Sequence, residues 1–255
     1  MELPMLTVGE YSLVYNMLSF CIASMVFSGL FFIIAKDRVA PQYRMSVILS
    51  TIVVGIAGYH YFRIFGSWEA AYVMEGANYV ASGTPFNDAY RYMDWLLTVP
   101  LLVVELLLLC SVAAERKSGL IFNTVVATVL MLVFGYLGET TGGTSLTDSR
   151  GIYGFLSTVP FVYIVWVLWN EVTVAMADKD GHLKILYRNI RFLLIFTWGY
   201  YPIVYMAPFI MDAAAATVNV QVGYTIADVA AKAGYGCLIY AIAKAKSDEE
   251  GYAMA

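Results

Sequence analysis

The sequence predicts an all-α membrane protein built as one bundle of seven transmembrane helices. Three observations lead to this fold class. Of the 255 residues, 60% are hydrophobic and only 13% are charged, whereas about a quarter of the residues in a soluble domain carry charge. Seven apolar stretches are long enough to cross a bilayer, which takes about 20 helical residues. Basic residues gather in alternate loops and in the C-terminal tail, which supports an odd number of crossings.

The seven predicted helices follow one another with short polar segments between them. We expect them at roughly 8–35, 43–66, 87–113, 120–139, 150–176, 185–211 and 217–244. Between the second and third helices, apolar residues alternate with turn residues at Tyr79, Val80, Gly83 and Pro85, which predicts a short β-hairpin. The chain shows no second domain and no tandem repeat. We therefore expect residues 1–255 to form a single membrane domain.

Lysine and arginine set the expected orientation, because they are enriched in loops on the cytoplasmic side. The loops after the first, third and fifth helices and the C-terminal tail hold eleven of the fifteen basic residues: Lys36, Arg38, Arg44, Arg116, Lys117, Lys179, Lys184, Arg188, Arg191, Lys244 and Lys246. We therefore expect an extracellular N-terminus and a cytoplasmic C-terminus. The net charge of −4 gives no basic surface for nucleic acid. The cysteines have no paired spacing, so we expect no metal site.

Several ionisable residues fall inside the predicted helices. They are His60, Arg91, Asp94, Glu105, Asp228 and Lys232. Such a group at membrane depth costs a few kcal/mol unless it is paired, so each one is a candidate functional residue. Arg91 lies near a helix end and could instead reach water with its long side chain. Lys232 cannot, because fifteen largely apolar residues precede it in its helix.

Helical spacing groups these residues on common faces. Asp228 and Lys232 are four residues apart, which places them one turn apart on one face. Glu105 follows Asp94 by eleven residues, so it returns to the same face roughly 16 Å nearer the cytoplasm. With Glu105 protonated, Arg91 and Lys232 balance the two aspartates, and a neutral group of four is cheaper to bury than any part of it. Carboxyl groups in different protonation states indicate an acid–base relay.

Three segments carry a resemblance to a known family. "DVAAKAGYG", with Asp228 four residues before Lys232, resembles the retinal-binding helix of the microbial rhodopsins. "RYMDWLLTVPLLVVE" resembles their third helix, and "WGYYPIVY" resembles their sixth. These motifs recur in order over nearly the whole chain. "GYHYFRIFGSWEAAY", with His60, is typical of the xanthorhodopsin-like proton pumps. The resemblance therefore implies a proteorhodopsin- or xanthorhodopsin-like domain in a bacterial-type plasma membrane.

The resemblance also implies the central roles. Lys232 would bind all-trans retinal as a protonated Schiff base. Asp94 would be the counterion and proton acceptor, and Asp228 would be the second counterion. Glu105 would be the cytoplasmic proton donor that returns a proton to the lysine nitrogen.

Supporting roles follow from the same resemblance. Thr98 would hydrogen-bond Asp94, and His60 would pair with it. Arg91 would lie on the extracellular side and guide the released proton outward. The acidic release pair of the archaeal pumps is not evident, because Val220 occupies one of the expected positions.

The residues at positions 94, 98 and 105 read Asp, Thr and Glu. In this family that triplet implies outward proton pumping, and hence an ion transporter and not an enzyme. One alternative is a photosensory rhodopsin with a slow cycle, although a sensor has little use for a donor such as Glu105. A second alternative is an ion-coupled transporter without a cofactor. Such transporters often have broken helices, and the last helix here contains no proline.

The resemblance also places a retinal pocket around Lys232. Its expected lining consists of Tyr92, Trp95, Leu102, Met131, Gly135, Ser157, Thr158, Trp198, Tyr201 and Pro202. A single aromatic residue on a transmembrane helix is more often a packing or interface residue, so each assignment depends on its position relative to Lys232. A leucine at position 102 goes with green absorption among the proteorhodopsins.

Gly154 leaves two interpretations open. A glycine there would leave a window in the helix wall, as in the xanthorhodopsins that bind a hydroxylated carotenoid as a light-harvesting antenna. Alternatively, it is a small residue that lets two membrane helices pack closely. The expected partners are the lipid bilayer, the transported proton and further copies of the chain in a homo-oligomer.

Overall fold

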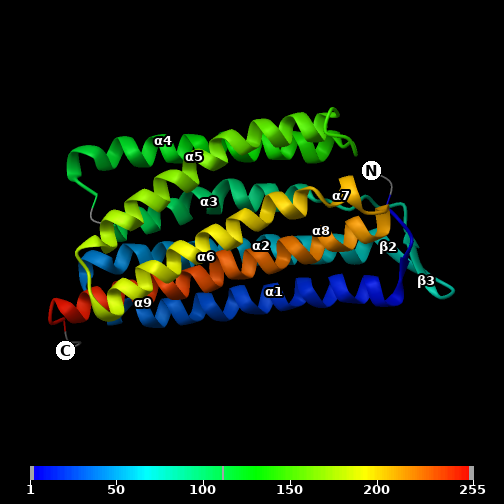
Figure 1. Cartoon of the computed structure of the whole chain (residues 1–255). Helices are drawn as coiled ribbons and strands as arrows, with labels where there is room; N and C mark the ends of the chain where they lie inside the picture. The colour runs from blue at the N-terminus through cyan, green and yellow to red at the C-terminus, as the bar shows by residue number, and fades with distance from the viewer. Residues whose placement is uncertain (1–2, 111, 253–255) are drawn as a thin grey trace.

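In the computed structural model, which describes residues 3–110 and 112–252, long helices run side by side along one axis (Figure 1). The first six crossings are α1 (Val8–Ala35), α2 (Arg44–Ala71), α3 (Ala89–Leu109), α4 (Ala114–Thr141), α5 (Ser149–Ala177) and α6 (Gly181–Tyr205). The seventh joins α8 (Ala213–Asp228), a π-helical segment η3 (Val229–Gly234) and α9 (Tyr235–Glu249). The two ends of the chain lie at opposite ends of the bundle (Figure 1). The predicted seven-helix fold is therefore confirmed.

Short elements connect these crossings. The 3₁₀ turns η1 (Lys36–Arg38) and η2 (Pro41–Tyr43) lie between α1 and α2, and the single turn α7 (Ala207–Ile210) follows α6. The predicted sixth crossing, which ran to residue 211, therefore consists of α6 and α7.

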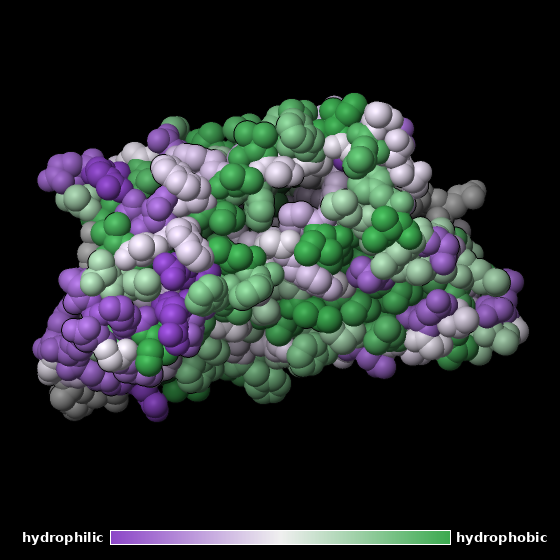
Figure 2. Space-filling view, in the orientation of Figure 1, coloured by the Kyte–Doolittle hydropathy of each residue, from purple (hydrophilic) through white to green (hydrophobic). Residues whose placement is uncertain are grey.

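On the face shown in Figure 2, apolar side chains form a broad band across the middle of the bundle, and polar side chains gather mainly toward one end. Among the described residues, six helical segments are long and apolar enough to cross a membrane. The helix α6 is not one of them, because Lys184, Arg188 and Arg191 lie in its first half. The side chains of Phe27, Phe62 and Phe196 are exposed at the surface of the bundle. Contact with lipid suits these apolar groups, whereas their exposure to water would cost free energy.

The predicted hairpin is present between α2 and α3. Its strands are β2 (Tyr72–Glu75) and β3 (Asn78–Ala81), and Gly76 adopts a positive φ of 61° in the turn. A third strand, β1 (Leu6–Thr7), pairs with β3 to give the order β1-β3-β2. This two-residue strand was not predicted, because so short a segment carries no alternating pattern.

Aromatic packing and a helix cap hold this end of the bundle together. The ring of Tyr11 stacks on Tyr79 of β3 at 3.7 Å between centroids, and on Trp68 of α2 at 5.7 Å. Thr7 and Glu10 form a capping box at the start of α1, in which Thr7 Oγ1 accepts from the Glu10 amide and Glu10 accepts from the Thr7 amide. Both backbone donors are thereby satisfied at the helix start.

The segment η3 is a wide turn that the sequence pattern did not predict. A π-helical turn, which has i→i+5 hydrogen bonds, is rare and is frequently found at functional sites. Here it carries Lys232, and it begins immediately after Asp228.

Candidate functional site

Lys232 lies at the centre of the bundle between two carboxylates. Its Nζ is 2.5 Å from Asp228 Oδ1 and 3.0 Å from Asp94 Oδ2. All three side chains have at most 1% of their surface exposed. Asp94 comes from α3, so the cluster joins the third helix to the seventh. A buried ammonium is tolerated only when it is paired in this way.

The Asp228 carboxylate accepts hydrogen bonds from three other helices and from Lys232 in its own crossing. Tyr61 Oη of α2 donates to Oδ2 at 2.7 Å, and Trp95 Nε1 of α3 donates to Oδ1 at 3.1 Å. Tyr201 of α6 also donates to Oδ1, as does Lys232. Multiple donors of this kind stabilise negative charge on a carboxylate.

Asp94 is much less restrained than Asp228. Neither oxygen of its carboxylate accepts a regular hydrogen bond from the described residues, although Lys232 Nζ lies 3.0 Å from Oδ2. Its lone pairs are therefore free for a proton. The two carboxylates share the ammonium of Lys232, but only Asp94 has oxygens that are free to accept its proton.

Two predicted partners of Asp94 lie differently from the expectation. Thr98 does hydrogen-bond Asp94, but Oγ1 donates to the backbone carbonyl at 2.9 Å and not to the carboxylate. This is the usual i−4 bond of a threonine within a helix. His60 directs Nδ1 to the carbonyl of Ile56 at 2.9 Å. Within the described residues it forms no ion pair or hydrogen bond with Asp94.

Glu105 is fully buried on the same helix as Asp94. Ser50 Oγ of α2 donates to its Oε2 at 3.0 Å, and Oε1 has no hydrogen-bond partner among the described residues. Glu105 forms no ion pair with a lysine, arginine or histidine of the described residues. A buried carboxyl group without a cation is the kind that carries a proton.

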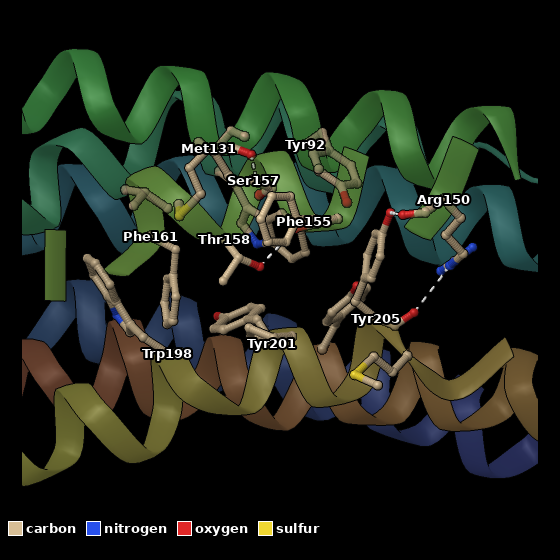
Figure 3. Close-up of a pocket in the computed structure, with 18 of the residues that line it drawn as sticks. Tyr92, Met131, Arg150, Phe155, Ser157, Thr158, Phe161, Trp198, Tyr201 and Tyr205 are labelled. Atoms are coloured by element: carbon tan, nitrogen blue, oxygen red, sulfur yellow. Dashed lines mark hydrogen bonds between the residues drawn. The ribbon is translucent and has the colours of Figure 1, made fainter. Parts of the chain in front are cut away.

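A cavity of about 310 Å³ extends from Lys232 toward α4 and α5. Figure 3 shows Trp198 and Phe161 at one end, and Tyr201 and Tyr92 on facing walls. Its lining includes every pocket residue named from the sequence: Tyr92, Trp95, Leu102, Met131, Gly135, Gly154, Ser157, Thr158, Trp198, Tyr201, Pro202 and Lys232. Flat aromatic walls, small residues and a terminal amine fit a conjugated aldehyde bound through an imine.

The cavity opens to the surface of the bundle beside α5 and α6. The lining residues Leu146, Phe155 and Met206 are 72%, 71% and 46% exposed, so this part of the wall faces outward. Tyr205 crosses the opening, donating to the Arg150 carbonyl at 2.8 Å (Figure 3). A Cβ added to Gly154 would lie 2.9 Å from Tyr205 Cε1, so the glycine makes room for that ring.

Arg91 lies on the side of Lys232 that is nearer the sheet. Its side chain is 2% exposed, and Nη1 donates to Gln221 Oε1 at 2.8 Å. Gln221 in turn donates to Asp88 Oδ1 at 3.0 Å. Arg91 Nε and Nη2 have no partner among the described residues. The arginine is therefore buried in the bundle, and the alternative of a side chain reaching water at the helix end does not hold.

Comparison with known proteins identifies the family. The sequence model of the bacteriorhodopsin-like proteins matches residues 13–246. The chain belongs to this family, the microbial (type 1) rhodopsins. This rhodopsin is 30% identical to the green-light absorbing proteorhodopsin of Gamma-proteobacterium EBAC31A08 over 225 residues, which cover 88% of this chain and 84% of that protein. It is a multi-pass protein of the cell membrane.

Two solved rhodopsin structures are also very similar. The structure of xanthorhodopsin, described as a light-driven ion pump with dual chromophore, superposes with a TM-score of 0.93 at 51% identity and covers 99% of this chain and 100% of that one. A thermophilic rhodopsin superposes with a TM-score of 0.90 at 47% identity, covering 98% of this chain and 100% of that one.

Sequence reasoning missed several residues of the site in this rhodopsin. Tyr61 donates to Asp228, Tyr224 lies against Trp95 at 5.0 Å between ring centroids, and Tyr205 covers the cavity opening. The chain contains 20 tyrosines, and no motif in the sequence distinguishes these three from the rest. The available signal for Tyr61 was its helical phase, since it lies in the apolar core face of α2 with Val54, Ala57 and Ile64.

Proposed function

We propose that this rhodopsin is a light-driven outward proton pump that binds all-trans retinal at Lys232. The proposal is supported above all by one observation: a buried amine lies between an anchored and an unanchored carboxylate at the wall of an aromatic cavity. The family binds retinal, and the relatives include proteorhodopsins and xanthorhodopsin.

Bound retinal supplies light absorption and a change of shape that redirects the N–H at Lys232. The residues of the chain then move the proton. Asp94 Oδ2, 3.0 Å from Nζ, accepts it, while Asp228 stays an anion because its donors hold it so. Glu105 later returns a proton to Nζ from the other side. Transfer from Glu105 and to Asp94 makes the transport one-directional.

The end of the bundle that carries the sheet is the proposed extracellular end. The opposite end holds most of the basic residues, including the loops beside α4 and α6 and the C-terminal tail. Glu105 lies on that side of Asp94 along α3, and Arg91 lies on the sheet side. With this orientation, the proton leaves past Arg91 toward the outside of the cell.

Illumination of cells that express the protein tests the function. We expect an unbuffered medium to become more acidic in the light, and we expect a protonophore to abolish the change. A medium that turns alkaline would contradict outward transport. A cycle lasting seconds without any pH change would favour the photosensory alternative.

Glu105→Gln is expected to leave the first transfer intact and to slow the return of the proton. An amide cannot give up a proton to Lys232, and loss of a positioned proton donor costs about a hundredfold or more in rate. Flash photolysis would record both steps through the absorption changes that accompany loss and recovery of the proton on Nζ. Glu171→Gln, at a carboxylate paired with Arg116 near the predicted cytoplasmic surface, is the matched control. Unchanged recovery in Glu105→Gln would remove Glu105 from the path.

A hydroxylated carotenoid is the second chromophore that we propose for this rhodopsin. Its ring would enter the opening beside Gly154, where Phe155 and Leu146 offer an exposed apolar surface. We expect carotenoid bands in the excitation spectrum of the retinal after the carotenoid is added, and their loss in Gly154→Trp. Absence of energy transfer in the parent protein, with the variant behaving identically, would exclude the antenna and leave Gly154 as a packing residue beneath Tyr205.

Leu102 contacts the cavity, and green absorption is the colour that we propose from the leucine at that position. A blue absorption maximum in the reconstituted pigment would contradict it.

A further inference from the structure

Glu139 is a buried carboxyl group that the proton path described above does not use. It lies two residues before the end of α4, at the end of the bundle that carries the sheet, and its side chain is 12% exposed. It therefore lies close to the proposed extracellular surface without being freely hydrated. Burial of a carboxyl group costs free energy, so this position indicates that Glu139 has a function.

Two tyrosines that line the retinal cavity donate to Glu139. Tyr92 Oη lies 2.6 Å from Oε2, and Tyr224 Oη lies 3.4 Å from the same oxygen. Both rings face the cavity on one side and Glu139 on the other. The carboxyl group is thus directly behind the cavity wall. Its second oxygen, Oε1, accepts no hydrogen bond from the described residues and has only Arg150 Nη2 near it, at 4.0 Å.

Tyr224 connects this carboxyl group to Arg91. The guanidinium carbon of Arg91 lies 5.6 Å from the centre of the Tyr224 ring, and the same ring packs against Trp95 beside Asp228. Arg91 also keeps Nε and Nη2 without partners among the described residues. These two nitrogens are therefore available as donors to further partners.

Charge balance favours a proton on Glu139 in the resting protein. The groups that face one another between Lys232 and the sheet are the cations Lys232, Arg91 and Arg150 and the acidic residues Asp88, Asp94, Asp228 and Glu139. Three positive charges and four carboxylates would leave one uncompensated negative charge, and one added proton restores neutrality. Glu139 is the group able to hold it, because Asp94 and Asp228 flank the ammonium and the Asp88 side chain is 44% exposed.

The other groups near Arg91 are poor candidates for this task. Gln221 bridges Arg91 and Asp88, but an amide does not release a proton near neutral pH. Val220 has no ionisable group. The hydroxyl of Tyr205 is already engaged, because it donates to the Arg150 carbonyl.

We propose that Glu139 releases the proton to the extracellular side. This inference rests on the proposed pump function. When the proton moves from Nζ to Asp94, one positive charge moves onto α3, three residues along the helix from Arg91. Glu139 then gives the proton on Oε1 to external water. The proton on Asp94 later restores Glu139, and Glu105 refills Nζ, so one proton enters for each one released.

Glu139→Gln tests the inference, with a pH-indicating dye in the medium during flash photolysis. In the parent protein we expect the proton to reach the dye before Nζ regains its own. In Glu139→Gln we expect this early release to be lost, so that the proton appears only after Nζ has recovered, and Glu139→Asp should restore it. Light-induced infrared difference spectra should show a carboxylic C=O band that the glutamine variant lacks. Glu171→Gln should leave the timing unchanged.

A purely structural role for Glu139 predicts a different result. The amide oxygen of glutamine still accepts from Tyr92 and Tyr224, so the wall would be preserved and the timing would not change. Early release that persists in Glu139→Gln would overturn the inference. Late release in both the parent protein and Glu139→Gln would overturn it as well. If Asp88→Asn delays release and Glu139→Gln does not, Asp88 is the releasing group. A dye that detects no proton from the parent protein refutes the pump function itself.

Discussion

Lys232→Ala is expected to abolish the pigment: purified protein supplied with all-trans retinal should show no visible absorption band. Alanine provides no amine for an imine, and no other lysine lines the cavity in the described part of the chain. The substitution also leaves Asp94 and Asp228 buried without their shared cation. Removing one partner of such a buried pair costs about 3–5 kcal/mol, unless a proton replaces it.

Because Lys232→Ala also weakens the fold, absorption has to be measured beside a test of folding. Circular dichroism and size-exclusion chromatography should show a helical, monodisperse protein before retinal is added. The matched control is Lys246→Ala, which removes a half-buried lysine whose Nζ donates to the Leu109 carbonyl, far from the cavity. It should keep the parental colour. A folded Lys232→Ala protein that forms the parental pigment would refute the attachment site.

Asp94→Asn is expected to stop light-driven acidification completely and to shift the absorption band to the red. Asparagine cannot take a proton from Nζ, so the first transfer has no acceptor. The red shift arises because a negative charge 3.0 Å from Nζ stabilises positive charge on that nitrogen in the dark state. When the negative charge is lost, the positive charge on the nitrogen spreads along a conjugated chromophore. The gap between its ground and excited electronic states then narrows.

The pigment itself should still form in Asp94→Asn. Asp228 remains 2.5 Å from Nζ and keeps its bonds to Tyr61 and Trp95, so one counterion persists. Asp178→Asn is the control, at a largely exposed carboxylate near the end of the bundle that is remote from the sheet. This variant should pump like the parent protein. Acidification at the parental rate in Asp94→Asn would eliminate Asp94 as the acceptor and leave Asp228 as the remaining candidate.

The helices and the central polar residues could be predicted because apolar and charged residues are easily distinguished in the sequence. Long apolar runs define the crossings, and the predicted first helix coincides with α1. Charged residues inside such runs are so costly that their helical phase is informative, and it correctly grouped Asp228 with Lys232. The pocket residues came from the family resemblance, and all of them line one cavity.

Contacts between helices were harder to predict. The Tyr61 bond to Asp228 and the Glu139 bonds to Tyr92 and Tyr224 depend on how separate helices are rotated, which no local pattern records. Glu139 was overlooked because it lies at a predicted helix end, where a carboxyl group needs no special explanation. The side-chain directions of Thr98 and His60 differ because nearby backbone carbonyls compete for their hydrogens.

The wide turn at Val229–Gly234 also affects how the last crossing would respond to changes in length. A π-helical turn accommodates one more residue than an α-helical turn of similar rise. Loss of one residue within it could therefore convert the turn to an ordinary one, with Ile239 and Ile242 of α9 still directed into the core. The same deletion elsewhere in α8 or α9 would rotate everything beyond it by about 100°. Natural length variation in this crossing should accordingly concentrate around the lysine.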